Sequence, residues 1–154
     1  MTTIAYDGKI VAADSMCLGE CHYRVNKLTR THGKIIGCSG GWSESNRFIR
    51  WMKDNCPAGS RPEFSEEFNA LVVHLDGSYR VFEKELEPMA FEDRFFAIGS
   101  GQAAAMGAMR AGANAKRAVE IACDVDPYSR GPVKFMRLKE NHAQGKKTKT
   151  DGQG

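Results

Sequence analysis

The chain has 154 residues, of which 42% are hydrophobic and 27% are charged, a composition typical of a single globular domain with its own core. The formal net charge is +3, and much of the basic excess lies near the end of the chain, so we expect no nucleic-acid partner. No apolar run reaches the ~18 residues of a membrane span, no signal peptide is evident, and the five cysteines form no disulfide-like framework, which together predict a cytoplasmic protein without a membrane partner.

The first forty residues predict short strands. Residues 2–5 and 10–13 are apolar or β-branched and are joined by Asp7-Gly8, a strong hairpin signal. Residues 17–31 are mixed, with short extended pieces. Residues 34–38 predict another strand, which ends at a serine and two glycines.

A helix is predicted from Trp42 to Asn55 because apolar residues recur there at helical spacing. The residues expected on its apolar face are Trp42, Phe48, Ile49, Trp51 and Met52. A loop over residues 57–62 follows. Residues 70–75 and 79–82 then predict a second hairpin around Asp76-Gly77.

The last third predicts a strand over residues 94–98, a tight turn at Gly99-Ser100-Gly101, two helices over residues 102–111 and 115–123, and a strand over residues 132–138. The first of these helices is rich in small residues, which favours close packing against another element. We expect one domain over residues 2–138 and a polar, basic, disordered tail over residues 139–154. The order of elements favours an α+β or layered α/β/α plan.

The N-terminus carries a candidate nucleophile. Methionine aminopeptidases remove Met1 before a small residue, and Thr2 would then carry a hydroxyl and a free α-amine on one residue. This amine has an unperturbed pKa near ~7.7–8.0, so a useful fraction is unprotonated at neutral pH and can act as a base. Read alone, the same segment is simply the start of a β-strand.

Four further residues lie in turns or at the ends of predicted strands, where they could assist a threonine hydroxyl. Asp14 follows an apolar strand, Lys27 lies between apolar residues, and Gly37 can offer its N–H without a side chain intervening. Ser100 lies in the turn before a helix. Each also has a structural interpretation, since Asp14 could cap a turn, Lys27 could be solvated and Ser100 could be a helix N-cap.

Five short motifs occur in order along residues 2–138. They are Thr-Thr-Ile at residues 2–4, Val-Ala-Ala-Asp at 11–14, Asn-Lys-Leu at 26–28, Ile-Ile-Gly-Cys-Ser-Gly-Gly at 35–41 and Ala-Ile-Gly-Ser-Gly at 97–101. Together they resemble the proteasome β-type N-terminal nucleophile (Ntn) hydrolases, and in particular the HslV peptidases. The resemblance implies a four-layer αββα sandwich of two antiparallel sheets.

The resemblance also implies site roles. Thr2 matches the nucleophile, Asp14 and Lys27 the acidic and basic residues beside it, and Gly37 the glycine whose N–H forms the oxyanion hole. Ser100 matches the serine near the threonine amine, and Asp126 and Ser129 match the distal aspartate and serine of proteasome β subunits. The substrate pocket would be lined by Met16, Cys17, Leu18, Ile35 and Ser39, and its apolar wall would favour an apolar side chain beside the scissile bond.

The implied activity is that of a threonine peptidase that cleaves peptides or unfolded proteins inside a self-assembled ring. No cofactor is required, although backbone carbonyls of Cys123, Asp126 and Ser129 match a loop that holds Na⁺ or a similar monovalent cation. Residues 57–68 are too few for the second helix that the family carries at this point, so we expect a reduced outer helical layer and weakened or abolished docking of an AAA+ unfoldase. Two alternatives are an ATPase-independent amidase of small peptides and a catalytically silent, ring-forming scaffold subunit.

Overall fold

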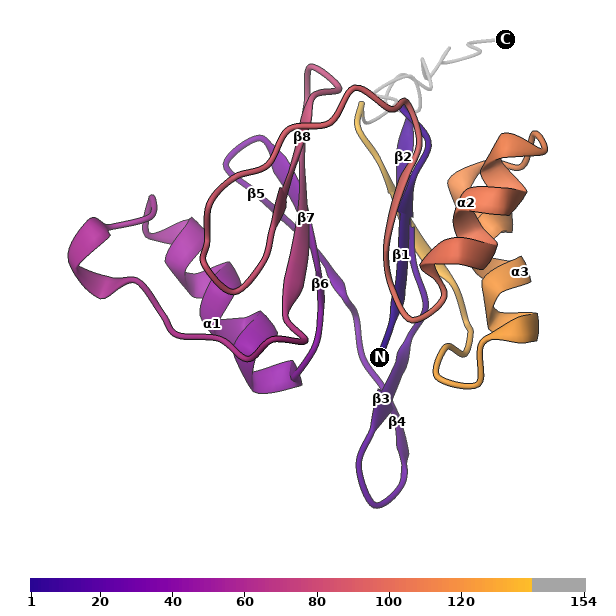
Figure 1. Ribbon diagram of the computed structural model, residues 1–154, viewed down its shortest axis with the longest axis horizontal. Coiled ribbons are helices and arrows are strands. Elements are labelled where there is room, and N and C mark those ends of the chain that lie inside the picture. The colour runs from indigo at the N-terminus through magenta and orange to yellow at the C-terminus, as the bar shows by residue number, and fades with distance from the viewer. Residues whose placement is uncertain (140–154) are drawn as a thin grey trace, which may run out of the picture.

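The computed structural model describes residues 1–139, and the predicted tail from residue 140 onward lies outside the described residues. The described part contains two four-stranded antiparallel sheets, a short hairpin and three α-helices (Figure 1). The chain is thus a mixed α/β protein built on antiparallel sheets.

The first sheet has the strand order β10-β2-β1-β9. Its strands are β1 (Thr3–Tyr6), β2 (Ile10–Ala13), β9 (Phe96–Gly99) and β10 (Lys134–Arg137). The predicted hairpin at Asp7-Gly8 joins β1 to β2, and Ile4 lies opposite Ala13. Two long-range pairings complete the sheet, with Thr3 opposite Gly99 and Lys134 opposite Ala13.

The second sheet has the strand order β5-β6-β7-β8. Its strands are β5 (Leu28–Thr31), β6 (Lys34–Ser39), β7 (Asn69–His74) and β8 (Tyr79–Phe82). The mixed segment before β5 forms a separate hairpin of β3 (Met16–Leu18) and β4 (His22–Arg24), which projects below both sheets in Figure 1.

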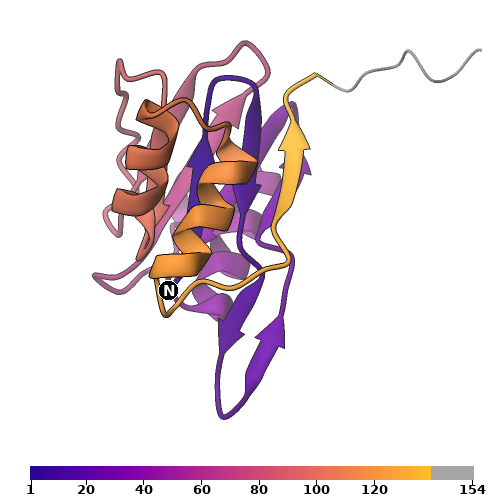
Figure 2. The same ribbon diagram turned by 90° about the vertical axis from the view of Figure 1, so that its right-hand side faces the viewer.

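The helices are α1 (Trp42–Lys53), α2 (Gln102–Arg110) and α3 (Ala115–Val125). Between α1 and β7 the described chain has only a one-turn 3-10 helix over Ala58–Ser60. Figure 2 shows α2 and α3 lying across the sheet that contains β1, β2 and β10. Figure 1 shows α1 on the opposite side of the molecule, against the second sheet.

Alternation along the strands divides the apolar residues among three clusters. The cluster between the sheets takes Ile4 and Tyr6 from β1 and Leu71 and Val73 from β7. The intervening Ala5 faces α2 and α3. Small residues dominate that second cluster, which lets both helices approach the sheet closely: Ala12, Ala97, Ala105, Ala115, Ala118 and Ala122.

The third cluster lies between α1 and the second sheet, where Phe48, Trp51 and Met52 contact side chains of β6, β7 and β8. Ile49 packs at its edge. The predicted apolar face is wrong at Trp42, which is 40% exposed. Trp42 is the first residue of α1 and belongs to none of the three clusters.

No helix within residues 1–139 is long and apolar enough to cross a membrane. The cytoplasmic location stays a prediction.

Candidate active site

The pairing of the first sheet gathers the candidate residues at one edge. Because its neighbouring strands are antiparallel, the start of β1 lies beside the end of β2 and the end of β9. Thr2 immediately precedes β1, Asp14 follows β2, and Ser100 follows β9. Lys27 comes from the residue before β5 of the other sheet, so the site lies where the two sheets meet.

Lys27 links Thr2 to Asp14. Its ammonium donates hydrogen bonds to the Thr2 hydroxyl oxygen and to Asp14 Oδ1, each at 2.9 Å, and to the Met1 carbonyl at 3.3 Å. These acceptors use all three ammonium protons. The side chains of Lys27 and Asp14 are 5% and 0% exposed, so this is a buried, hydrogen-bonded ion pair.

Asp14 is held rigidly by the backbone as well. Its Oδ1 also accepts from the Thr3 N–H at 3.1 Å, and its Oδ2 accepts from the N–H groups of Met16 and Arg130, both at 3.2 Å. A carboxylate bonded in this way fixes the position of the Lys27 ammonium in front of Thr2.

A second polar network lies on the amine side of Thr2. The Ser100 hydroxyl accepts from the Thr2 N–H at 3.3 Å and donates to Asp126 Oδ2 at 2.7 Å. The Ser129 hydroxyl donates to the same carboxylate oxygen at 2.5 Å and lies 2.6 Å from the Thr3 hydroxyl. Burial alone would raise the pKa of Asp126, but hydrogen bonds from Ser129 and Ser100 hold it below its usual value.

Met1 covers the site. The Thr2 hydroxyl donates a 2.6 Å hydrogen bond to the Met1 carbonyl, and Thr2 is only 3% exposed while Met1 is 53% exposed. With Met1 attached, the Thr2 nitrogen is an amide and cannot act as a base. The structure therefore shows Thr2 with its hydroxyl beside Lys27 and its amine blocked.

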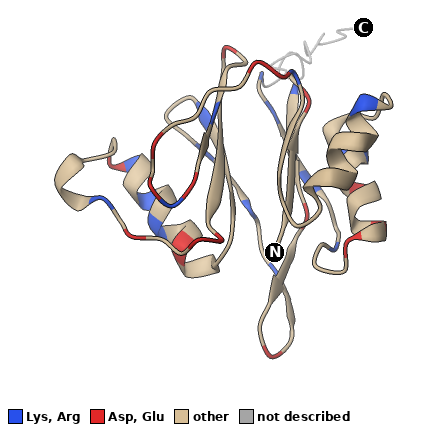
Figure 3. Ribbon diagram, in the orientation of Figure 1, with Lys and Arg blue, Asp and Glu red and all other residues tan. Residues whose placement is uncertain are grey.

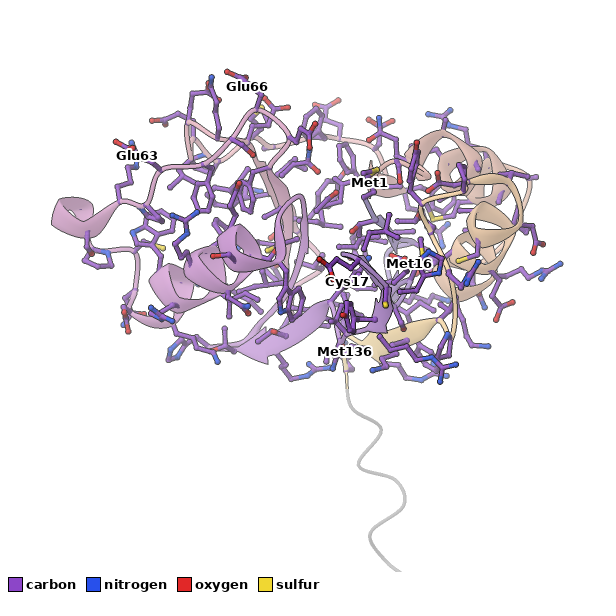
Figure 4. The ribbon with its side chains drawn as sticks, turned by 90° about the horizontal axis from the view of Figure 1, so that it is seen from below. Met1, Met16, Cys17, Glu63, Glu66 and Met136 are labelled. Atoms are coloured by element: carbon purple, nitrogen blue, oxygen red, sulfur yellow. The ribbon has the colours of Figure 1, made fainter. Side chains whose placement is uncertain are left out.

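A cavity of about 240 Å³ opens beside Thr2. Figure 4 shows the labelled Met1, Met16 and Cys17, all of which line it. The complete lining is Met1, Thr2, Met16, Cys17, Leu18, Val25, Lys27, Cys38, Gly40, Gly41, Trp42, Ser45 and Glu67. Of the five residues predicted for this pocket, it contains Met16, Cys17 and Leu18.

Ile35 and Ser39 depart from the predicted lining. Ile35 is fully buried in the cluster between the sheets, because the alternation of β6 turns it away from α1 and turns Cys38 toward the cavity. Ser39 lines a neighbouring hollow of about 310 Å³ together with Ser100.

Gly37 lies in β6 opposite Leu28, the residue after Lys27. A Cβ at this position would lie 2.9 Å from the Ile4 side chain, so the two sheets approach each other closely here. Gly37 is absent from the lining of the cavity. The oxyanion role of its N–H stays a prediction.

The turn after β9 needs glycine for steric reasons that its sequence does not reveal. Gly99 has a φ of +95°, and a Cβ there would lie 1.9 Å from the Thr2 carbonyl oxygen. A Cβ on Gly101 would lie 2.0 Å from the Thr3 hydroxyl oxygen. These glycines let the turn carry Ser100 against the N-terminal backbone.

Sequence reasoning missed Thr3, Trp42 and Glu67. Only strand alternation could have indicated Thr3, whose hydroxyl points to Ser129 on the face opposite to Thr2. Two cysteines near the site, Cys38 and Cys123, are poor nucleophile candidates. Burial raises the pKa of the Cys38 thiol well above its ordinary value, and burial together with Asp14 raises that of Cys123 to about 11.

The predicted cation site spans the last turn of α3 and the loop that follows it. Pro127 has no N–H, so it leaves the Cys123 carbonyl without a helical donor. The Asp126 carbonyl accepts from the Ser129 N–H at 3.3 Å. Within residues 1–139 no group of three or more His, Cys, Asp or Glu side chains is arranged to hold a metal ion.

No protein-family model matches the chain, and no curated protein is significantly similar to it in sequence. Solved structures are similar in fold. Thiobacillus denitrificans BPH, alone and in complex with epoxomicin, superposes with a TM-score of 0.67 at 19% identity, over 90–91% of this chain and 99% of that one. Eukaryotic HslV from Trypanosoma brucei superposes with a TM-score of 0.63 at 20% identity, over 88% of this chain and 97% of that one. The chain therefore has an HslV-like fold, and at this identity the likeness establishes the fold alone.

Proposed function

We propose that this protein is a threonine-type endopeptidase whose nucleophile is the hydroxyl of Thr2, exposed by removal of Met1. We further propose that its layers are those of the αββα Ntn hydrolase sandwich, with α1 alone forming one reduced outer layer. One observation carries the functional proposal: the buried Lys27 ammonium bridges the Thr2 hydroxyl and Asp14 at 2.9 Å each.

The proposed reaction uses the two groups of Thr2 together. The hydroxyl attacks the carbonyl carbon of a peptide bond, and the free amine takes its proton, directly or through water. Lys27⁺, fixed by Asp14, lowers the proton affinity of both groups. A backbone N–H, which we assign to Gly37, stabilises the tetrahedral oxyanion, a contribution worth ~2.7–4 kcal/mol in other hydrolases.

The tetrahedral intermediate then collapses. The C–N bond breaks, the leaving nitrogen receives the proton held by the Thr2 amine, and an ester joins the acyl half to the Thr2 oxygen. Water hydrolyses this ester and restores the hydroxyl. Ser100, which bonds the Thr2 nitrogen and Asp126, keeps the amine in place during both proton transfers.

The cavity beside Thr2 supports an apolar preference on the acyl side of the scissile bond. Met16, Leu18, Val25 and Trp42 supply apolar surface. Of its two charged residues, Lys27 is paired with Asp14, and Glu67 also lines the neighbouring hollow. An apolar side chain would be favoured because it removes this surface from water.

Epoxomicin, the compound bound by the Thiobacillus structure, provides a direct test. As an epoxyketone it offers one electrophilic carbon to the hydroxyl and another to the amine of an N-terminal threonine. We expect intact-mass measurement to show one inhibitor per chain, only on molecules that lack Met1. Thr2→Ala should take up none, and Thr31→Ala, a matched change in β5, should react normally. Labelling of Thr2→Ala, or an active preparation that retains Met1 quantitatively, would refute this chemistry.

We also propose assembly into a ring. The likeness to HslV supports it, and α2 presents the exposed small residues Ala103 and Gly107, which allow close helix packing. Light scattering above micromolar concentration should find a homo-oligomer. If light scattering finds only a 17.0 kDa monomer, ring assembly is wrong. An active Thr2 in that monomer would favour an autonomous peptidase, and an inactive Thr2 would argue against the ring and the autonomous peptidase alike.

The reduced outer layer leads us to propose that small apolar peptides are cleaved without ATP and that an HslU-type unfoldase does not dock. Only α1 and the one-turn helix at Ala58–Ser60 lie between β6 and β7 in the chain. Adding HslU and ATP to a folded substrate tests this, and robust ATP-dependent degradation would show that α1 alone suffices for docking.

Finally, we propose that carbonyl oxygens of Cys123, Asp126 and Ser129 can hold a monovalent cation such as Na⁺. The Cys123 carbonyl, which has no helical donor, fits this role. The ion would add positive charge near Asp126 and support the loop. Exchange of Na⁺ for choline should lower the midpoint temperature of thermal unfolding. An unchanged midpoint temperature would count against the site.

A further inference from the structure

The two hollows at the site are separated by the N-terminal residue. The cavity beside Thr2 and the neighbouring hollow share Met1, Gly40 and Glu67 in their linings. If Met1 is removed, the two become neighbouring parts of one groove that passes Thr2. A peptide lying along this groove would place its two halves on opposite sides of the nucleophile.

The chemistry of the reaction decides which half enters which hollow. The leaving nitrogen takes its proton from the Thr2 amine, so the leaving half must lie on the amine side. The Thr2 nitrogen is bonded to Ser100, which lines the second hollow and not the first. The second hollow therefore receives the leaving half of the substrate.

The second hollow, like the first, has polar side chains in its lining. Ser39, Asn69, Ser100 and Gln102 contribute side-chain hydroxyls and amides. Within residues 1–139, Asn69 Oδ1 is the buried side-chain polar atom left without a hydrogen-bond partner. A buried acceptor without a partner is costly, and a donor from the substrate would satisfy it.

Glu67 supplies the charge of this hollow and also lines the first cavity. Its side chain is exposed, and no basic residue within the described range forms an ion pair with it. Its neighbour Glu66 pairs with Lys84 instead. Figure 3 shows acidic residues along the segment that leads into β7, and the pairing of β6 with β7 brings Glu67 beside Gly40 at the edge of the site.

We propose that the hollow lined by Ser39, Glu67, Asn69, Ser100 and Gln102 binds the first residue of the leaving half, and that Glu67 selects lysine or arginine there. The carboxylate attracts the cation, and the Asn69 oxygen accepts one of its hydrogen bonds. This inference rests on the proposed peptidase function and adds a specificity for the residue after the scissile bond.

The test uses one peptide series with an apolar residue before the scissile bond and Lys, Gln or Glu after it, with fluorescence quenching across the bond. We expect kcat/KM for Lys to exceed that for Gln by about two- to fivefold, and Glu to be the poorest, as befits a partly solvated ion pair. The preference should weaken at 1 M salt.

Variants locate the effect. Glu67→Gln should bring the Lys-to-Gln ratio of kcat/KM to about one, and Glu67→Lys should reverse the order of Lys and Glu. Glu66→Gln is the matched control, because Glu66 lines neither hollow and lies apart from Met1 and Met16 in Figure 4. That variant should keep the wild-type ratio.

Two failures can be told apart. An aminocoumarin amide of the same acyl peptide has no side chain on its leaving half, so its hydrolysis reports the peptidase function alone. If wild type does not hydrolyse it, the proposed function fails. If wild type hydrolyses it, the role of Glu67 is wrong in any of three cases. The Lys-to-Gln ratio of kcat/KM is one in wild type, Glu67→Gln leaves that ratio unchanged, or Glu67→Gln alters only the preference for the residue before the bond.

Discussion

The Lys27 ammonium lies at the same 2.9 Å from the Thr2 hydroxyl oxygen and from Asp14 Oδ1. One cation thus connects the residue before β1 with the residue after β2. Because Asp14 accepts three backbone N–H groups in addition, Lys27 has little freedom to move. Its charge is preorganised where negative charge would develop on the Thr2 oxygen.

The first prediction concerns the nucleophile. Thr2→Ala should reduce hydrolysis of the aminocoumarin amide by at least about 10³-fold, because no other group can form the ester. Thr2→Ser should keep measurable activity, since it retains hydroxyl and amine. Circular dichroism and urea unfolding should show a folded Thr2→Ala protein, and activity above a tenth of wild type in that variant would contradict the assignment.

The second prediction separates stability from catalysis at the ion pair. Lys27→Met leaves the Asp14 carboxylate buried without its cation and should lower the free energy of unfolding by about 3–5 kcal/mol. The double variant Lys27→Met/Asp14→Asn should regain part of that loss and remain inactive. Urea unfolding and hydrolysis rates measure the two effects independently.

If the double variant recovers activity together with stability, Lys27 acts only through folding. The side chain of Asp14 is 0% exposed, so its carboxylate should need the Lys27 cation to be stable in the folded protein. A Lys27→Met variant as stable as wild type would contradict this.

Local patterns in the sequence predicted most of the elements. The turns at Asp7-Gly8 and Asp76-Gly77 are set by glycines with φ of +98° and +92°, a conformation that their dipeptides signal directly. The apolar spacing of α1 gave its core residues Phe48, Trp51 and Met52. The candidate site residues came instead from motif resemblance, and their proximity follows from long-range strand pairing.

Features that depend on non-local packing could not be predicted. Trp42 fits the helical pattern but is exposed and belongs to none of the apolar clusters. Ile35 fits a pocket motif, but alternation buries it between the sheets. Glu67 carries no signal in its own segment. It reaches the site because β6 pairs with β7, with Ser39 opposite Asn69.

The third prediction tests the turn that carries Ser100. Gly99→Ala places a Cβ 1.9 Å from the Thr2 carbonyl oxygen at a φ of +95°, so the backbone must shift. We expect a loss of several kcal/mol in the free energy of unfolding and loss of hydrolysis. The matched control is Gly59→Ala in the one-turn helix Ala58–Ser60, where a Cβ meets nothing within 4 Å. That variant should keep the wild-type free energy of unfolding within about 0.5 kcal/mol, and equal effects of the two changes would contradict the close packing at Gly99.

The last prediction concerns pH. Hydrogen bonds from Ser129 and Ser100 outweigh burial and hold the pKa of Asp126 below its usual value, so the folded state favours the ionised carboxylate. This stabilisation is fully present above the unfolded pKa of ~3.9 and is lost as pH falls through the lower folded pKa. Asp126→Asn should therefore lower the free energy of unfolding by about 1–3 kcal/mol at pH 7. The difference in this free energy between wild type and variant should become smaller below about pH 4. Urea midpoints at pH 7, 5 and 3 measure this, with the exposed Asp124→Asn as control. A gap that stays constant down to pH 3 would show that the carboxylate stabilises the loop by its shape and not by its charge.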